Sequence, residues 1–461
     1  MKKTVKKGIT VFLAVFLLLA IFTVNVFADE KEPVEFKAYI WSENELLSTV
    51  MEELYYFELT SDTNTFESNE TYVVRGSVTV PNRIECGQNV KLVLTDGSEL
   101  CAEKGIHVRG SLEIFGGTEN TGTLVSNLTK SENGFSSIGI NTGDTSCSVT
   151  VHGGQIKLRH DGNDPCINAG SGDFTLYRGN VEARSYDGNG ITAGTITVCD
   201  GNLLGTSAFS AGISGNTVTI YGGEMNFEGV YGAGIEGKDI TINGGIIEAE
   251  SSSGAGIGSG TVKKTFKGIT SCNSITINDG NISTSSYTGA SIGSGQDGSC
   301  GTITINGGRI MPEMSYGGAL GSGVGGSCSL VNINGGLVIN FNLFDTGYAF
   351  RGEAGFGSKA GKMPDIKLGK GVKVVYRDSF IYSEPEERYV TSDSKNIKET
   401  LQDRRSIAVL PKEQDEMRNG GTGSFFSSGS SAILISCMTL LLGGAAGFLM
   451  GRRYWHKDSN D

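Results

Sequence analysis

A Gly-Gly pair, or a variant that keeps its second glycine, recurs along the middle of this chain and divides it into similar units. The second glycine falls at Gly154, Gly179, Gly201, Gly223, Gly245, Gly280, Gly308 and Gly336. Successive gaps are 25, 22, 22, 22, 35, 28 and 28 residues, which a 22-residue unit with loop insertions explains. A repeat of this length is typical of solenoids and other arrays of stacked units, and it gives a place to many of the 69 glycines.

Each unit holds three short segments separated by glycine turns. The first alternates strictly, as in 195–198 (Thr-Ile-Thr-Val) and 217–220, and the second follows the Gly-Gly pair, as in 245–250. The third is Gly-Ala-Gly-Ile-Gly-Ser-Gly at 254–260. A period of two is typical of a half-buried strand, and the 3.6-residue period of helical repeats is missing. The chain is therefore predicted to form an all-β, right-handed parallel β-helix solenoid over 76–370, with about 22 residues and three strands per coil.

Like positions of successive coils should stack into columns at the strand spacing of ~4.8 Å. One inward column of the first segment holds Val198, Ile220, Ile242, Ile277, Ile305 and Ile333. The inward column of the third segment is expected to hold Ile140, Ile167, Ile191, Ile213, Ile235, Ile257, Ile292 and Leu320. Asparagines precede the Gly-Gly turn at Asn243, Asn278, Asn306 and Asn334, and their amides are expected to bond to one another along the axis.

The two termini have the features of targeting and anchoring segments. Residues 1–28 join a lysine-rich start to an apolar run and a small-residue cleavage site, which predicts a signal peptide. Residues 432–450 are nineteen residues without charge, followed by Arg452 and Arg453, which predicts a retained transmembrane helix with a cytoplasmic tail at 451–461. The expected location is the cell membrane, with a single pass and the bulk of the chain outside the cell.

The segments beside the repeats are expected to close the ends of the solenoid, because an open coil would pair with other chains. Residues 29–75 form the predicted N-terminal cap, with a helical spacing from Glu45 to Leu54. Residues 371–411 form the predicted C-terminal cap, ending in the strand-like stretch 406–410. Residues 412–431 are polar and rich in glycine and serine, which indicates a linker to the membrane.

The net charge of −12 disfavours nucleic acid as a partner, because phosphates are bound by lysine and arginine. The four histidines show no zinc spacing, and we predict neither a metal site nor a cofactor. Calcium could be held only if dispersed carboxylates converged, since it takes six to eight oxygen ligands. No catalytic residue is predicted, because no paired carboxylates stand at adjacent strand positions.

Three cysteines, Cys272, Cys300 and Cys328, lie at the same offset before their Gly-Gly turns. They should stack on neighbouring coils, within the distance that a disulfide requires. Two interpretations stay open: one disulfide with a leftover thiol, or a buried column of small apolar side chains.

The chain resembles the glycine-rich, pectin-lyase-like β-helix surface proteins of Gram-positive bacteria, many of which are described as carbohydrate-binding. The resemblance covers about residues 40–410 and lies in 76–80 (Gly-Ser-Val-Thr-Val), 90–100, 105–108 and the repeated Ile-Asn-Gly-Gly and Gly-Ile-Gly-Ser-Gly strings. It implies a surface-displayed β-helix with a glycan or a host surface ligand as its partner.

The leading hypothesis is a non-catalytic, adhesin-like protein that binds carbohydrate along its stacked strands. The candidate ligand-binding residues are Thr197, Thr219, Thr241, Thr276 and Thr304, Glu182, Glu248 and Glu250, and Tyr221 and Tyr231. Threonine also suits any exposed strand, so that column has a purely structural alternative. Two other functions remain: a polysaccharide lyase or hydrolase, by analogy of fold alone, and a structural envelope stalk without a small ligand.

Overall fold

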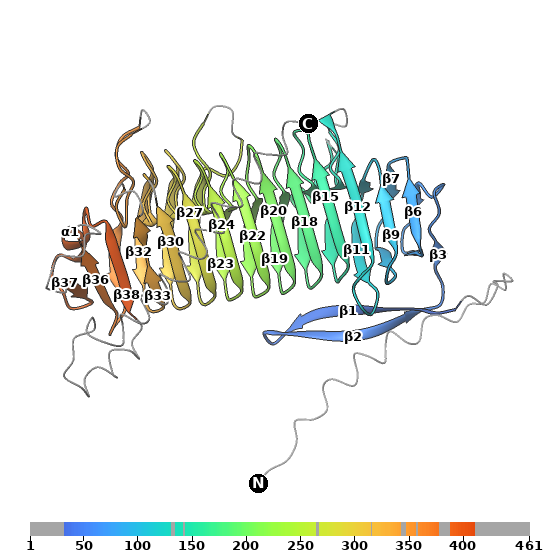
Figure 1. Cartoon of the computed structure of the whole chain (residues 1–461), viewed down its shortest axis with the longest axis horizontal. Coiled ribbons are helices and arrows are strands. Elements are labelled where there is room, and N and C mark those ends of the chain that lie inside the picture. Colours follow the sequence, from blue (N-terminus) through green and yellow to red (C-terminus); the bar gives the residue numbers. More distant parts are fainter. Residues whose placement is uncertain are drawn as a thin grey trace, which may run out of the picture.

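The computed structural model describes residues 32–410, apart from 131–133, 142, 264–266, 315, 343–346, 356–357 and 378–387. Within these residues the chain forms a right-handed β-solenoid of about 11 turns with almost no helix. Figure 1 shows the coils stacked along one axis, from the N-terminal coils at one end to the C-terminal coils at the other. The predicted all-β solenoid and its repeats are confirmed for the described part of the chain.

Two long sheets run along the solenoid. The 15-stranded sheet, called the front sheet, contains β6 (Ser77–Val80), β9 (Glu99–Ala102), β12 (Thr123–Leu128), β15 (Gln155–His160), β18 (Asn180–Ser185), β20 (Asn202–Ser207), β22 (Glu224–Gly229), β24 (Ile246–Ser251), β27 (Asn281–Ser286), β30 (Arg309–Met314), β33 (Leu337–Ile339), β34 (Phe341–Asn342), β36 (Lys373–Arg377), β37 (Arg388–Thr391) and β38 (Ser406–Leu410). The 21-stranded sheet, called the back sheet, contains β3 (Phe57–Glu58), β4 (Thr65–Phe66), β5 (Thr71–Val74), β7 (Ile84–Cys86), β8 (Val90–Leu94), β10 (Ile106–Val108), β11 (Ser111–Gly116), β13 (Ile138–Gly139), β14 (Ser148–Val151), β16 (Ile167–Asn168), β17 (Asp173–Leu176), β19 (Ile191–Val198), β21 (Ile213–Ile220), β23 (Ile235–Ile242), β25 (Ile257–Gly258), β26 (Ser271–Ile277), β28 (Ile292–Gly293), β29 (Ser299–Ile305), β31 (Leu320–Gly321), β32 (Ser327–Ile333) and β35 (Asp365–Leu368). A short helix, α1 (Ile397–Leu401), lies near the C-terminal end.

Neighbouring coils pair in parallel and in register, so the inward columns exist as predicted. Ile196 pairs with Val218 and Val218 with Ile240, and all three side chains are buried. The third-segment column differs at its start, where Ile138 rather than Ile140 stands opposite Ile167. A shift of two residues keeps a side chain on the same face of a strand, so the alternation alone could not distinguish these two isoleucines.

The first and third segments of a coil belong to the same back sheet. In β19, β21 and β23 they join into one continuous strand, whereas later coils keep them apart, as in β28 and β29. The second segment of each coil lies in the front sheet. The two sheets therefore enclose the core, and each coil contributes one outward row of side chains to the front sheet.

The N-terminal segment departs from the sequence-based expectation. The helical spacing from Glu45 to Leu54 is wrong as a prediction of helix, because Glu45–Glu53 is strand β2, paired antiparallel with β1 (Val34–Ser42). This hairpin runs along the side of the solenoid in Figure 1. Strands of the back sheet begin at Phe57, before the predicted start of the solenoid. Backbone pairing with β1 outweighs the local spacing of apolar residues in β2.

One turn column between the back and front sheets explains where the hairpin lies. Along successive coils this column holds Phe115, His152, Tyr177, Cys199, Tyr221, Asn243, Asn278, Asn306 and Asn334. In its first half the rings of Phe115, His152 and Tyr177 stack at centroid distances of 4.4 and 4.9 Å. In its second half Asn278, Asn306 and Asn334 each donate the Nδ2–H to the Oδ1 of the preceding asparagine at 2.8 Å, so the predicted asparagine ladder is confirmed.

At the C-terminal end the strand pairing changes from parallel to antiparallel. Strand β38 occupies the predicted stretch 406–410 and pairs antiparallel with both β33 and β36. The expected signal peptide, linker, transmembrane helix and tail lie outside the described residues. No helix in the described part is both long and apolar enough to cross a membrane.

Candidate ligand-binding groove

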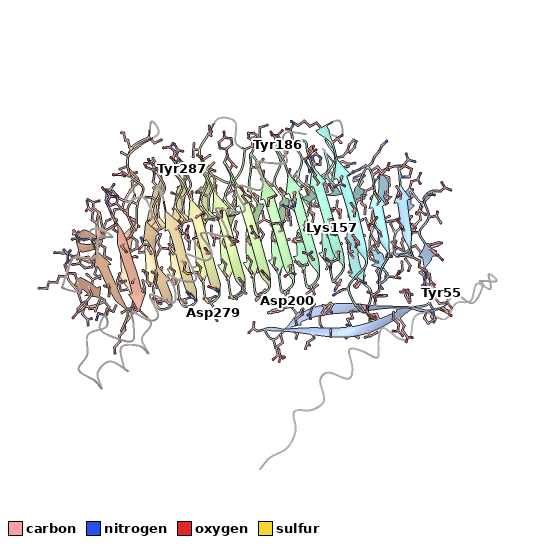
Figure 2. The ribbon with its side chains drawn as sticks, in the orientation of Figure 1. Tyr55, Lys157, Tyr186, Asp200, Asp279 and Tyr287 are labelled. Atoms are coloured by element: carbon pink, nitrogen blue, oxygen red, sulfur yellow. The ribbon has the colours of Figure 1, made fainter. Side chains whose placement is uncertain are left out.

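A shallow hollow of about 520 Å³ lies on the outer face of the front sheet, between β18 and β30. Its lining, called the central groove, includes Asn180, Glu182, Arg184, Asn202, Leu204, Glu224, Asn226, Ile246, Glu248, Asn281, Ser283 and Met311. A second hollow of about 420 Å³ shares Asn180, Asn202, Glu224 and Ile246 with it and extends to Asp200. Figure 2 shows Asp200 at the lower edge of the solenoid, so the hollowed surface reaches from mid-sheet to that edge.

The central groove offers hydrogen-bonding groups at intervals of one coil. Asn180 pairs in register with Asn202, and Asn202 with Glu224, so their side chains form one outward column. In the next column Asn226 donates its Nδ2–H to Glu248 Oε2 at 3.2 Å. Exposed apolar area is present as well, since Ile246 is 56 % exposed. The surface therefore combines amides and carboxylates with apolar patches.

A third outward column brings together acidic residues that are far apart in the sequence. Glu228 pairs with Glu250, Glu250 with Ser285, and Ser285 with Glu313. Glu248 lies two residues before Glu250 on the same strand and face. We call Glu228, Glu248, Glu250 and Glu313 the acid row. The sequence suggested acids spread over separate coils, and the register places Glu228 and Glu250 on adjacent strands with Glu313 two strands further along.

The acid row has perturbed ionisation. Burial, with the added repulsion of Glu248, Glu228 and Glu313, raises the pKa of Glu250 to about 7. Burial and then Glu248 also raise the pKa of Glu313. Carboxyls one strand apart oppose each other's charge because parallel strands are separated by only ~4.8 Å. Two members of the acid row, Glu250 and Glu313, therefore hold their protons more tightly than a carboxyl in water does.

Aromatic side chains follow the upper ends of the front strands. Tyr186 and Phe209 are 5.2 Å apart between ring centroids, and Phe209 and Tyr231 are 6.4 Å apart. Farther along, Tyr287 and Tyr316 meet edge to face at 5.3 Å. Figure 2 shows Tyr186 and Tyr287 on the same upper edge. This aromatic edge adjoins the acid row, because each aromatic follows the last residues of a front strand.

The structure separates the predicted ligand-binding residues into different surfaces. Glu182, Glu248 and Glu250 lie on the front sheet, the first two in the central groove. The threonines lie half-buried on the back sheet, in register from coil to coil: Thr197, Thr219, Thr241, Thr276 and Thr304. A single small ligand cannot contact both sheets. The glutamates and the threonine column are thus two alternative faces.

The two predicted tyrosines also lie on different surfaces. Tyr231 belongs to the aromatic edge, where the Lys263 ammonium lies 3.9 Å from its ring centroid. Tyr221 lies in the turn column, and its ring packs on Trp41 of the hairpin at 4.6 Å. One face of the Tyr221 ring is therefore covered by Trp41, whereas Tyr231 lies beside the front sheet.

One buried carboxyl, that of Glu236, was not predicted from the sequence. Glu236 on β23 is fully buried, and its Oε1 accepts hydrogen bonds from Ser214 Oγ and from the Ile269 N–H, both at 2.8 Å. Its Oε2 has no hydrogen-bond partner within the described part of the chain. Burial raises the pKa of Glu236 to about 7. The repeat does contain a signal for this residue, because Glu236 occupies a position at which the next coil has a glycine, Gly258.

The three cysteines stack as the repeat predicts. Cys272 pairs with Cys300, and Cys300 with Cys328, and all three are buried and carry free thiols. Hydrogen bonds with the Cys272 and Cys328 thiols, followed by burial, raise the pKa of Cys300 well above its usual value. The structure thus shows a stacked, buried column, and whether two of these thiols join in a disulfide stays a prediction to be tested.

Native alkylation should test this thiol column. We expect Cys272, Cys300 and Cys328 to resist iodoacetamide in the folded protein and to react after denaturation, because buried protonated thiols are poor nucleophiles. The half-buried Cys101 is the internal control and should react first. Peptide mass spectrometry measures each site. Only one reactive thiol among the three after denaturation would instead show that a disulfide had formed.

No group of three or more histidine, cysteine, aspartate or glutamate side chains in the described residues is placed to hold a metal ion. His107 has two acidic neighbours, with Nδ1 at 2.7 Å from Glu85 and Nε2 at 2.8 Å from Asp144. The hydrogen bond with His107 lowers the pKa of Asp144. Both ring nitrogens are therefore occupied by hydrogen bonds, one to Glu85 of β7 and one to Asp144.

Comparison with protein families, curated proteins and solved structures finds no match for this chain. The repeated coils are compatible with a pectin-lyase-like β-helix, which describes the architecture and not an activity.

Proposed function

We propose that this protein is a non-catalytic, cell-surface β-helix protein that binds a glycan along the central groove. The observation that supports this most directly is the groove itself, where amides, carboxylates and apolar side chains recur at the spacing of the coils. A sugar chain presents hydroxyl groups and apolar ring faces at regular intervals. Side-chain amides and carboxylates suit the hydroxyls, and exposed apolar or aromatic side chains suit the faces.

The proposed site of action is outside the cell, as a module related to the pectin-lyase-like surface proteins of Gram-positive bacteria. The lysine-rich apolar start at 1–28 supports export, and the uncharged stretch 432–450 followed by two arginines supports a membrane tether. In this arrangement the front sheet would be displayed to glycans of the environment or of a host.

Binding is tested with the purified full-length chain on a broad array of oligosaccharides, with and without calcium. Replacing both Asn202 and Asn226 with alanine should weaken binding by about tenfold, because each amide contributes a hydrogen bond to the ligand. The matched control replaces Thr219 and Thr241 on the back sheet and should bind as the wild type does. If the threonine variant alone lost binding, the ligand would lie on the back sheet instead. Retention of no sugar at all would favour a structural stalk.

A second candidate function, polysaccharide hydrolysis, is favoured by the acid row. A carboxyl with a raised pKa beside ionised carboxylates is the arrangement that glycoside hydrolases use for acid and base catalysis. Glu250 has the raised pKa, and Glu228 and Glu248 are its acidic neighbours. Release of shorter products by the wild type, and its loss in Glu250→Gln with binding retained, would replace the binding function with this one.

A further inference from the structure

The hairpin β1–β2 is attached to the solenoid through β1. Phe36 packs on Phe115 with ring centroids 4.7 Å apart, and the Tyr39 N–H donates to His152 Nδ1 at 3.0 Å. Burial lowers the pKa of His152 to about 4, so its ring is neutral at pH 7 and Nδ1 can accept this bond. One edge of the two-stranded sheet is thereby held against the turn column.

Strand β2 forms the other edge of this sheet. Among the described residues it pairs with β1 alone, in a sheet of two strands. Its middle residues are open to solvent, with Leu47, Val50 and Met51 at 46, 55 and 40 % exposure. The strand contains neither proline nor lysine, the residues that commonly protect an exposed edge. Seven of the nine residues of β2 are exposed, and they include three of its four apolar side chains.

The turn fixes which backbone groups face outward. Glu43 and Asn44 have φ values of 52° and 67°, and Ser42 pairs with Glu45, as in a two-residue type I′ hairpin. In such a hairpin the residue pair that closes the turn is hydrogen-bonded, and so is every second pair after it. In the remaining pairs the backbone N–H and C=O groups point away from the partner strand, toward the outer edges of the sheet. The outward N–H groups of β2 are then those at 46, 48, 50 and 52. Tyr39, the partner of Ser48, points its N–H outward in the same way, toward His152.

The charge of the hairpin indicates what could pair there. The hairpin carries five glutamates against a single Lys37, whose Nζ donates to the Thr118 carbonyl at 2.6 Å. Glu53 lies 3.8 Å from Lys91 Nζ of the solenoid, and the other four glutamates are exposed: Glu35, Glu43, Glu45 and Glu52. A second copy paired across a twofold axis would bring these glutamates together, and like charges on facing strands destabilise a sheet. The net charge of −12 opposes self-association as well. A segment with basic residues has the complementary charge.

We infer that the outer edge of β2 is a docking site for an extended, cationic segment of another protein, which adds to the hairpin as a third strand. Main-chain hydrogen bonds to the outward groups of β2 supply affinity in this mode of recognition, and alternate side chains supply selectivity. Because side chains alternate between the two faces of a strand, the partner's apolar residues would lie beside Leu47 and Met51 on one face, and its basic residues would lie beside Glu52 on the other.

The test uses the full-length chain and labelled nonapeptides of alternating valine and lysine, or of alternating valine and glutamate. We expect the cationic peptide to raise fluorescence anisotropy on binding and to slow hydrogen exchange in residues 45–53, and the anionic peptide to do neither. Val50→Pro should weaken binding by about tenfold or more, because it removes an outward N–H while leaving the hydrogen bonds to β1 in place.

Two further variants distinguish edge pairing from loss of structure. Far-UV circular dichroism must show that Val50→Pro keeps the fold. The double variant Glu45→Lys and Glu52→Lys should bind the anionic peptide in preference to the cationic one. Equal binding of the cationic peptide to wild type and Val50→Pro would overturn the inference. So would a dimer in sedimentation experiments that Val50→Pro abolishes, since the occupant would then be a second copy.

Discussion

Gly293→Ala is expected to destabilise the solenoid by about 4 kcal/mol, because a side chain there meets both backbone strain and a steric clash. Gly293 pairs with Gly258 on one side and Gly321 on the other, in a column that continues from coil to coil. Its φ is 140°, which L-residues rarely adopt. An added Cβ would lie 1.9 Å from the Gly321 carbonyl oxygen. The coils cannot separate locally without breaking the register of the adjoining strands.

Urea unfolding followed by circular dichroism measures this effect as a lower midpoint. Repeat arrays are stabilised by contacts between neighbouring repeats, so the weakened interface could let the solenoid unfold in two parts. In that case the apparent dependence of the unfolding free energy on urea concentration, the m-value, would also fall. Gly355→Ala is the matched control, because a Cβ added there would meet no atom of the described residues within 4 Å and its φ needs no glycine. A Gly293 variant as stable as the Gly355 variant would disprove the steric argument.

Glu236→Gln is expected to remove a pH dependence of stability of about 3 kcal/mol. The pKa of Glu236 is raised to about 7 in the folded protein, from a usual value of 4.5. The folded state therefore holds the proton more tightly than the unfolded state does. The contribution of the protonated group is fully present below pH 4.5 and is lost as the pH rises toward 7 and above. The glutamine keeps an Oε1 acceptor for Ser214 and Ile269 but cannot ionise.

The measurement is the free energy of unfolding from pH 5 to pH 8 in wild type and variant. The raised pKa values of Glu250 and Glu313 change stability with pH in the same direction and are present in both proteins. The difference between the two slopes of unfolding free energy against pH therefore reports the contribution of Glu236 alone. Glu224→Gln, an exposed change in the central groove, is the control and should keep the wild-type slope. Parallel pH profiles for wild type and Glu236→Gln would mean that the buried carboxyl does not titrate in this range.

The repeat, most strands of the solenoid and the inward columns of the first segment could be predicted from the sequence. These depend on alternation within a coil and on a regular glycine turn, and both are local patterns. The asparagine ladder and the Cys272–Cys300–Cys328 column followed as well, because equal offsets from the same turn become equal heights in a stack. The exported and membrane-tethered character also comes from local patterns, but those segments lie outside the described residues and stay a prediction.

The tertiary structure alone decided how the outward residues combine. The acid row exists because loop insertions leave the strand register intact, so Glu250 and Glu313 come within two strands of each other across 63 positions of sequence. The placement of β2 depended on long-range pairing, which reversed the helical interpretation of 45–54. The burial of Glu236 depended on the chain around Ile269 folding back over β23. A repeat pattern defines which way each side chain points; what covers it depends on loops and ends that do not repeat.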